Sequence, residues 1–217
     1  LTLNENGDCR ASLTDESYDA MSDDIDCTGD GTTSITCQIT DLGSDGTKNV
    51  YIACQDTLGN KDTADTNTDL TYTLDTTGPT LSFTDDVEAG PVQSDTITAD
   101  WGDATVKKWD YDADQTCSTN PNDYSYTDTD SMDQSDETNN GKYICLYGED
   151  SLGNISTLAS SNDINIDATP PTQSNHNPSN NSTINDPTPT ITLTLNENGD
   201  CRASLTDESY DAMSDDI

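Results

Sequence analysis

Apolar and polar residues alternate with a period of two along most of the chain. Three segments show this most clearly, with apolar positions at Val50, Ile52 and Cys54, at Leu70, Tyr72 and Leu74, and at Ile164 and Ile166. Threonine fills many of the polar positions, while Gly, Asn, Asp and Pro cluster between the alternating segments. This pattern is typical of half-buried strands separated by turns. Apart from a turn expected near Ser17–Met21, no segment shows helical periodicity, so the sequence predicts an all-β fold.

The chain contains a long internal repeat. Residues 1–25 and 193–217 are identical, an offset of 192 residues. Duplication of this one segment would give the same identity, but the interpretation we favour is a tandem array of near-identical units of 192 residues. Residues 172–217 then open the next unit.

A weaker repeat divides the unit into two domains. The motif D-x-L-G-N occurs at residues 56–60 and 150–154, and each copy is followed by an alternating segment and a D-x-T-x-P motif, at residues 75–79 and 167–171. The Leu-Gly-Asn elements predict hairpin turns in which glycine supplies a positive φ. A spacing of about 92 residues suits one β-sandwich domain. We therefore expect domain one at residues 1–79, lacking its opening strand, domain two at 80–171, and the opening part of the next domain one at 172–217, here named the third segment.

The runs QDTLGN to DTTGPT and EDSLGN to DATPPT resemble the bacterial Ig-like tandem repeats of large extracellular adhesins and surface filaments. The resemblance covers the second half of each domain. It implies tandem immunoglobulin-like or fibronectin-III-like β-sandwiches in a surface-anchored stalk. Most such repeats lack cysteines, so the cysteines of this chain depart from the pattern.

The cysteines indicate that disulfides staple the sandwiches. One period holds six of them, because Cys201 is the copy of Cys9. An even number in a unit of this type favours three disulfides over free thiols. Domain two offers only Cys117–Cys145, whereas domain one allows three pairings, of which we favour Cys9–Cys54 across the sandwich and Cys27–Cys37 around a local loop.

The position of Cys145 differs from that of Cys54 relative to the following D-x-L-G-N motif. Cys145 lies five residues before Asp150, whereas Cys54 lies two residues before Asp56. An odd difference places the two cysteines on opposite faces of corresponding strands. We therefore expect Cys117–Cys145 to hold a loop against the outside of its sheet.

The chain is strongly acidic, with 43 Asp and Glu residues against 7 Lys and Arg and a formal net charge of −36. This balance excludes nucleic acid as a partner and disfavours an anionic membrane surface. No apolar run is long enough for a membrane span. One period carries a net charge of −30, which favours an extended, soluble rod. Because the chain begins at Leu1 without Met, we expect its natural N-terminus to lie upstream.

No motif for catalysis is present, and the single histidine, His176, has no second histidine to form a triad or metal site, so the sequence does not predict an enzyme. No cofactor is expected. Calcium is the one metal to consider, because carboxylates suit it, although the DYDAD run fails as an EF-hand loop. Weak calcium candidates lie near the domain junctions, at Asp75, Asp85, Asp86 and Asp167.

The function expected from the sequence is a non-catalytic structural repeat of an extracellular stalk or filament at the cell surface. Its partners are neighbouring units of the same protein, joined in tandem or by strand complementation. Domains roughly 30–40 Å long give an advance of about 60–80 Å per period. The alternative is an adhesin module that binds a glycan or a protein through the loops or aromatic residues of domain two. Those residues are Trp101, Trp109, Tyr111, Tyr124, Tyr126, Tyr143 and Tyr147.

Overall fold

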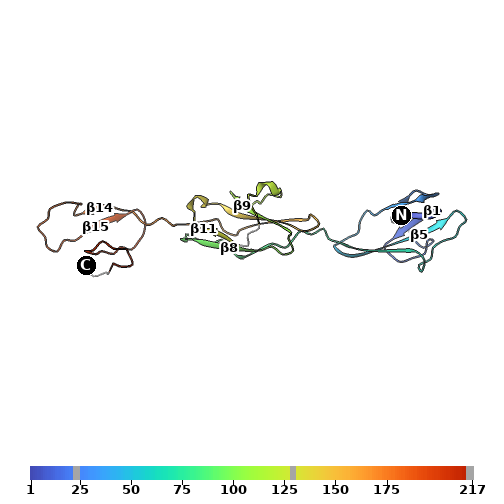
Figure 1. Ribbon diagram of the computed structural model, residues 1–217, viewed down its shortest axis with the longest axis horizontal. Helices are drawn as coiled ribbons and strands as arrows, with labels where there is room; N and C mark the ends of the chain where they lie inside the picture. Colours follow the sequence, from blue (N-terminus) through green and yellow to red (C-terminus); the bar gives the residue numbers. More distant parts are fainter. Residues whose placement is uncertain (22–24, 128–130, 214–217) are drawn as a thin grey trace.

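A computed structural model describes residues 1–21, 25–127 and 131–213. The described residues form strands and two short 3₁₀ turns, at Pro121–Asp123 and Glu137–Asn139, and they contain no α-helix. Their strands fall into three groups whose ladders stay within each group. The three groups lie in a row along the long axis of the molecule, with domain two in the middle (Figure 1). The expected all-β class is therefore confirmed.

Domain two is built from two sheets that face each other across a core. One sheet has the order β11-β8-β7 and the other β10-β9-β12-β13. Alternate positions of β8 and β12 supply Ile97, Ile144 and Leu146, which are fully buried, and Trp109 of β9 packs with them. The seven strands are β7 (Ser82–Asp85), β8 (Asp95–Asp100), β9 (Val106–Asp112), β10 (Tyr126–Thr127), β11 (Ser131–Gln134), β12 (Tyr143–Glu149) and β13 (Ile155–Ala159).

Domain one has one four-stranded sheet, in the order β3-β1-β5-β6, and a separate two-stranded ribbon, β2-β4. Its core is smaller than that of domain two. Half of the side chains in this core belong to cysteines, alanine and valine. The strands are β1 (Thr2–Ser12), β2 (Asp26–Thr28), β3 (Thr32–Ser34), β4 (Thr36–Gln38), β5 (Gly46–Asp56) and β6 (Thr68–Leu74). The strand β1 changes register between Thr2 and Gly7, so its first residues continue away from β5.

The third segment is a single hairpin with little core. Its strands are β14 (Gln173–Asn177) and β15 (Thr192–Leu195), and every side chain of β14 is exposed. The peptide bond between Asn177 and Pro178 is cis.

The two identical 25-residue copies keep the same local contacts but differ in strand pairing. Arg10 lies 4.4 Å from the ring of Tyr18, and Arg202 lies 4.5 Å from the ring of Tyr210. Both tyrosine hydroxyls donate to the aspartate two residues before the arginine. However, Gly7–Ser12 pair with β5, whereas residues 199–204 are not in a strand. The second copy therefore shares its local contacts with the first but not its strand pairing, because no described strand beside residues 199–204 corresponds to β5.

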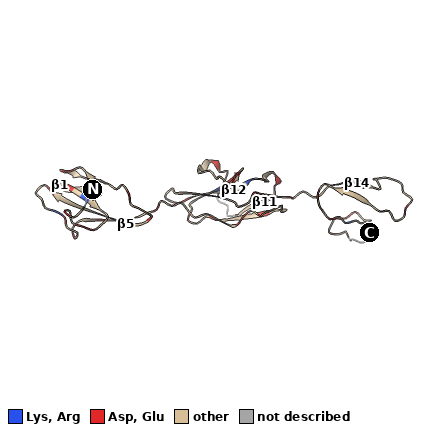
Figure 2. Ribbon diagram, turned by 180° about the vertical axis from the view of Figure 1, so that it is seen from behind, with Lys and Arg blue, Asp and Glu red and all other residues tan. Residues whose placement is uncertain are grey.

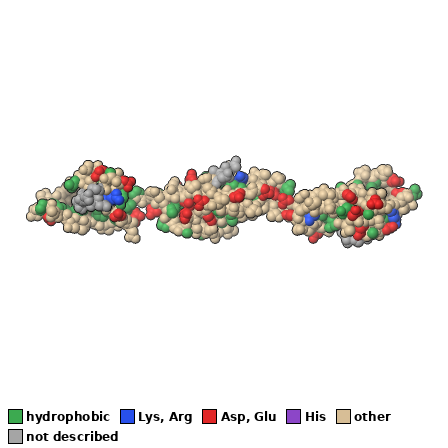
Figure 3. Space-filling view, turned by 90° about the horizontal axis from the view of Figure 1, so that it is seen from below, with side chains coloured by type: hydrophobic (Ala, Val, Ile, Leu, Met, Phe, Trp, Pro, Cys, Tyr) green, Lys and Arg blue, Asp and Glu red, His purple; other side chains and the backbone are tan. Residues whose placement is uncertain are grey.

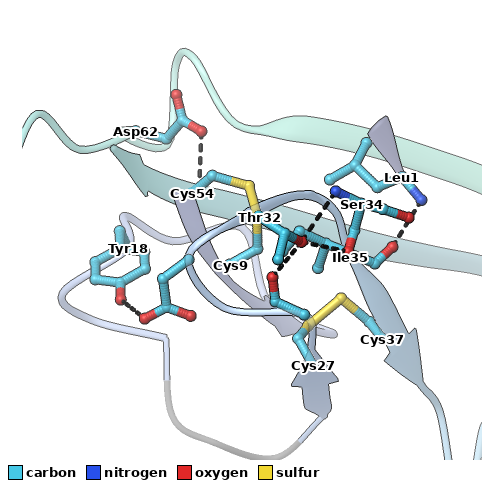
Figure 4. Close-up of a disulfide and its surroundings, with 12 residues drawn as sticks. Leu1, Cys9, Tyr18, Cys27, Thr32, Ser34, Ile35, Cys37, Cys54 and Asp62 are labelled. Atoms are coloured by element: carbon cyan, nitrogen blue, oxygen red, sulfur yellow. Dashed lines mark hydrogen bonds between the residues drawn. A yellow bond between two sulfur atoms is a disulfide. The ribbon is translucent and has the colours of Figure 1, made fainter. Parts of the chain in front are cut away.

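The three disulfides are Cys9–Cys54, Cys27–Cys37 and Cys117–Cys145, the pairs expected from the sequence. Cys9 and Cys54 face each other in the ladder between β1 and β5, so their bond lies within one sheet and the expectation that it crosses the sandwich is wrong. Cys27–Cys37 joins facing residues of β2 and β4. Both bonds pack in the domain-one core (Figure 4). They take the place of large apolar side chains in this small core.

Cys145 lies on the face of β12 opposite the domain-two core. Its neighbours Ile144 and Leu146 pack in that core, whereas Cys145 and Tyr147 form a separate cluster with Tyr124. The disulfide to Cys117 holds the loop between β9 and β10 over this outer face. The odd spacing to Asp150 therefore located Cys145 correctly.

Removing a disulfide should destabilise its own domain. We expect the double substitution Cys9→Ala/Cys54→Ala to lower the free energy of unfolding of domain one by about 4 kcal/mol, the chain-entropy value for a loop of this length. Both tryptophans lie in domain two, so tryptophan fluorescence reports that domain, and amide exchange of β5 reports domain one.

The double substitution Cys117→Ala/Cys145→Ala is the matched control. It should lower the midpoint of the unfolding transition followed by tryptophan fluorescence and leave amide exchange of β5 unchanged. A stable domain one after loss of Cys9–Cys54 would contradict the role given to that disulfide.

Candidate functional site

The D-x-T-x-P motif at residues 75–79 is held by the domain that it leaves. Asp45, directly before β5, accepts hydrogen bonds from the Thr76 amide at 3.0 Å and the Thr76 hydroxyl at 2.7 Å, both through Oδ1. The Thr77 hydroxyl donates to Oδ2 of the same carboxylate. These bonds fix the middle of the motif against the start of β5. We call residues 75–79 the first linker and residues 167–171 the second linker.

The second D-x-T-x-P motif is held in the same way. Glu137 Oε1 accepts from the Ala168 amide at 2.8 Å and from the Thr169 hydroxyl at 2.7 Å. Asp45 and Glu137 are 92 residues apart, the same offset as that between the two motifs. The linker and its acidic partner therefore recur as one unit.

Hydrogen bonds lower the pKa of both linker-binding carboxyl groups. For Asp45 the main cause is the Thr77 hydroxyl, followed by the donors of Thr76. For Glu137 the main cause is the Thr169 hydroxyl, followed by the Ala168 amide. Each donor favours the ionised carboxylate, so both linkers are held best above the acidic pH range.

The first linker is also held by the domain that it enters. Asn154 Nδ2, in the second D-x-L-G-N turn, donates to the carbonyl oxygen of Asp75 at 3.1 Å. A methyl group at Gly148 would lie 3.1 Å from Pro79 Cγ, and one at Gly78 would lie 2.4 Å from the Ile155 carbonyl oxygen. A methyl group at Gly78 would clash with backbone, and one at Gly148 would push Pro79 away by a few tenths of an ångström, so glycine at both positions lets the linker lie closely against domain two.

The D-x-L-G-N turns have the same internal hydrogen bonds. Asp150 Oδ1 accepts from the amides of Leu152 and Asn154, and Asp56 Oδ1 accepts from those of Leu58 and Asn60. The Asn60 side chain, followed by the amides, lowers the pKa of Asp56. Burial opposes ionisation of Asp150, but the donors of Asn154 outweigh it and the pKa is also lowered. In each turn the aspartate thus also holds the asparagine side chain, and in the second turn that asparagine, Asn154, donates to the first linker.

The structure does not bring the four calcium candidates together. Asp86 accepts from the amides of Val87 and Ser161, and Asp75 accepts from the Thr77 amide. Asp85 is exposed on β7, and the Asp167 amide donates to the Val92 carbonyl. Within residues 1–21, 25–127 and 131–213, no group of three or more His, Cys, Asp or Glu side chains could hold a metal ion.

Most aromatic residues of domain two contribute to its packing. Trp101, Trp109, Tyr124 and Tyr147 are buried, and Tyr111 donates to Gln134 at 2.9 Å. Tyr126 is the exception, being 43% exposed while its ring stacks on Trp109 at 4.2 Å between centroids. Tyr111 and Tyr143 are partly buried, so among these candidates in the described part of the chain Tyr126 alone is exposed.

No known protein family, curated protein or solved structure matches the chain. Among the described residues, no helix has the length and apolar character needed to cross a membrane. The linker with its acidic partner is the feature that recurs at both junctions.

Replacing either linker-binding acid should loosen its own junction. Alanine at position 45 would remove both carboxylate oxygens, which accept from the Thr76 amide and from the hydroxyls of Thr76 and Thr77. We expect Asp45→Ala to speed amide exchange at Thr76 by roughly five- to tenfold, the scale of one lost hydrogen bond. Glu137→Ala, which removes the oxygen shared by the Ala168 amide and the Thr169 hydroxyl, should do the same at Ala168 and leave Thr76 unchanged, so each variant is the control for the other. Unchanged exchange in both variants would contradict the role of these acids.

The same junctions should loosen in acid. In an unfolded chain the pKa values of Asp and Glu are about 3.9 and 4.3. The pKa values of Asp45 and Glu137 in the folded protein are lower. Stabilisation by a carboxylate with a lowered pKa is complete above the unfolded pKa and is lost as the pH falls through the folded value. NMR titration should show the Thr76 and Ala168 amide signals moving below about pH 4, whereas movement centred well above that pH would contradict the assignment.

Proposed function

We propose that this chain is a structural repeat unit of an extended stalk or filament outside the cell, built from tandem Ig-like β-sandwiches. The observation that carries the proposal is a double recurrence. A 25-residue segment returns without change after 192 residues, and a linker with its acidic partner returns after 92 residues. A spacer uses the same unit and the same joint many times, whereas a binding protein or an enzyme needs a distinct site.

The strand arrangement of domain two supports the Ig-like assignment. Its first, second and fifth strands, β7, β8 and β11, form one sheet, while β9, β10, β12 and β13 form the other. In immunoglobulin-like sandwiches, strands A, B and E likewise lie opposite C, F and G, with an added C′ strand beside C. Domain one has the counterpart of the second sheet in β1, β5 and β6.

The surface charge supports an extended form. Acidic residues outnumber basic ones along the ribbon (Figure 2), and on the face shown in Figure 3 acidic side chains lie on all three parts of the row. Like charges on successive domains repel each other and disfavour folding of the row back on itself. The hydrogen-bonded linkers add a local restraint at each joint.

The three disulfides support a location outside the cell. Disulfides form and persist in oxidising compartments and are rare in the cytosol. Two of them stabilise domain one, whose apolar core is small. A stalk exposed to the environment would gain from such cross-links, because they limit unfolding of a weak core.

Adding one period should lengthen the molecule without changing its thickness. A chain with one further copy of residues 1–192 before Leu1 should have a maximum dimension greater by about 60–80 Å in small-angle X-ray scattering, with the same cross-sectional radius. The 217-residue chain is the reference. A compact particle, with little increase in maximum dimension and a larger cross-section, would contradict the proposal.

A further inference from the structure

Domain one has an open strand edge where domain two has a complete sheet. In domain two the middle strand β8 is paired on both sides, because Thr98 faces Asp85 of β7 and Ser131 of β11. In domain one only the first residues of β1 represent this middle strand. Leu1 and Ile35 exchange two backbone hydrogen bonds, of 2.9 and 3.0 Å, and Thr2 faces Ser34. On the other side of these residues, no described strand of the 217-residue chain takes the place that β7 has in domain two.

The third segment contains the strands that domain one lacks. Its pairs Ser174–Thr194 and Asn177–Thr192 correspond to the pairs Ser82–Asp100 and Asp85–Thr98 of domain two, and a register shift lies between the two pairs in both hairpins. The sequence Thr-Ile-Thr occurs at residues 96–98 and again at 190–192. The hairpin β14-β15 is therefore the counterpart of β7-β8.

The internal repeat shows how a third segment and domain one can combine. Leu193–Leu195 have the same sequence as Leu1–Leu3, so Thr194 and Thr2 are the same position of the 192-residue unit. Thr194 pairs with Ser174, and Thr2 pairs with Ser34. When Thr194 and Thr2 are treated as one position, β14 pairs with a strand made of β15 and the start of β1, and that strand pairs with β3. This is the order β7-β8-β11 of domain two.

A pocket of about 380 Å³ lies where the incoming linker would enter domain one. Its walls are residues 1–7, the end of β5 at Cys54–Asp56, residues 60–62 and Thr68. By alignment of the two D-x-L-G-N turns, Cys54 corresponds to Gly148 of domain two, against which Pro79 of the first linker lies. The pocket thus occupies the position that the linker fills in domain two.

In the third segment, the residues identical to residues 1–7 already contact the second linker. Pro171 Cγ lies 3.5 Å from the position of a methyl group on Gly199, the copy of Gly7. Residues 167–171 line a cavity together with Leu195, Glu197 and Asn198, which are copies of Leu3, Glu5 and Asn6. The wall formed by residues 3–7 therefore has a known occupant in its second copy.

We propose that residues 167–192 of another unit of this protein complete domain one, with the linker in this pocket and Thr190–Thr192 along the open edge of β4. This inference rests on the proposed tandem arrangement and names the contact that joins successive units. The linker places the Asp167 carbonyl beside Asn60 Nδ2, as Asp75 lies beside Asn154. Ile191, now 62% exposed, takes the core position of Ile97, which is fully buried.

The donor comes from a different unit because of the direction of the chain. The start of β5 lies at the linker to domain two, where Asp45 binds Thr76, and β5 then runs for 11 residues. Its far end, with the pocket, faces away from domain two, whereas the third segment lies on the opposite side of domain two (Figure 1). A segment of the same unit therefore cannot reach the pocket.

Extending the chain tests the proposal. In the extended chain, residues 167–192 precede Leu1 and recreate the order Thr192–Leu193 found later in the sequence. The Ile35 amide donates to the Leu1 carbonyl. Backbone amides alternate between the two edges of an antiparallel strand, so the amide of Cys37, two residues later, points to the same edge. Beyond Leu1 this edge is open in the 217-residue chain. We expect amide exchange at Cys37 to slow by on the order of tenfold or more relative to the 217-residue chain.

Two substitutions within the added segment sharpen the test. Ile191→Asp places a charge in the completed core and should abolish the added protection of Cys37, whereas Ile184→Asp, in the connection between β14 and β15, should leave it in place. Unchanged or faster exchange at Cys37 in the extended chain would overturn the strand assignment. Such a result, together with the expected increase in length per period, would leave the stalk proposal standing. Slower exchange without that increase would remove the stalk proposal and keep the strand assignment.

Discussion

The hydrogen bonds of the D-x-T-x-P linkers are the constraint on which the form of this protein depends. At the first junction, Asp45 holds the linker from the domain behind it, and Asn154 holds it from the domain ahead. Glycine at positions 78 and 148 lets the backbone and Pro79 lie directly on domain two. A linker bonded on both sides sets the direction in which domain two follows domain one.

Other features of the structure favour an extended form. Apolar residues are few, and domain one combines a small core with two disulfides that join facing strand residues. The acidic surface keeps successive domains apart, while the linkers limit how each joint bends. In domain one, stability therefore comes from cross-links and local hydrogen bonds more than from a large buried core.

The sequence predicted the fold class and the cysteine pairs, because strand alternation and residue parity are local properties. Parity also placed Cys145 on the outer face of β12. It could not show that Cys9–Cys54 lies within one sheet, since that depends on how β1 pairs with β5. The linker partners Asp45 and Glu137 were missed because they lie far from the motifs in sequence, although both precede their motif by the same interval. The calcium candidates do not come together because they lie on the first linker, at the end of β7 and on the second linker, and the carboxylates of Asp75 and Asp86 accept hydrogen bonds from amides.

The central claim is that the linkers join the domains into one rod, and ¹⁵N relaxation of the 217-residue chain tests it most directly. If domains one and two are joined as described, their amides will fit a single, strongly anisotropic rotational diffusion tensor with its long axis along the row. Separate tensors for the two domains, each with the short correlation time of an isolated sandwich, would contradict the claim.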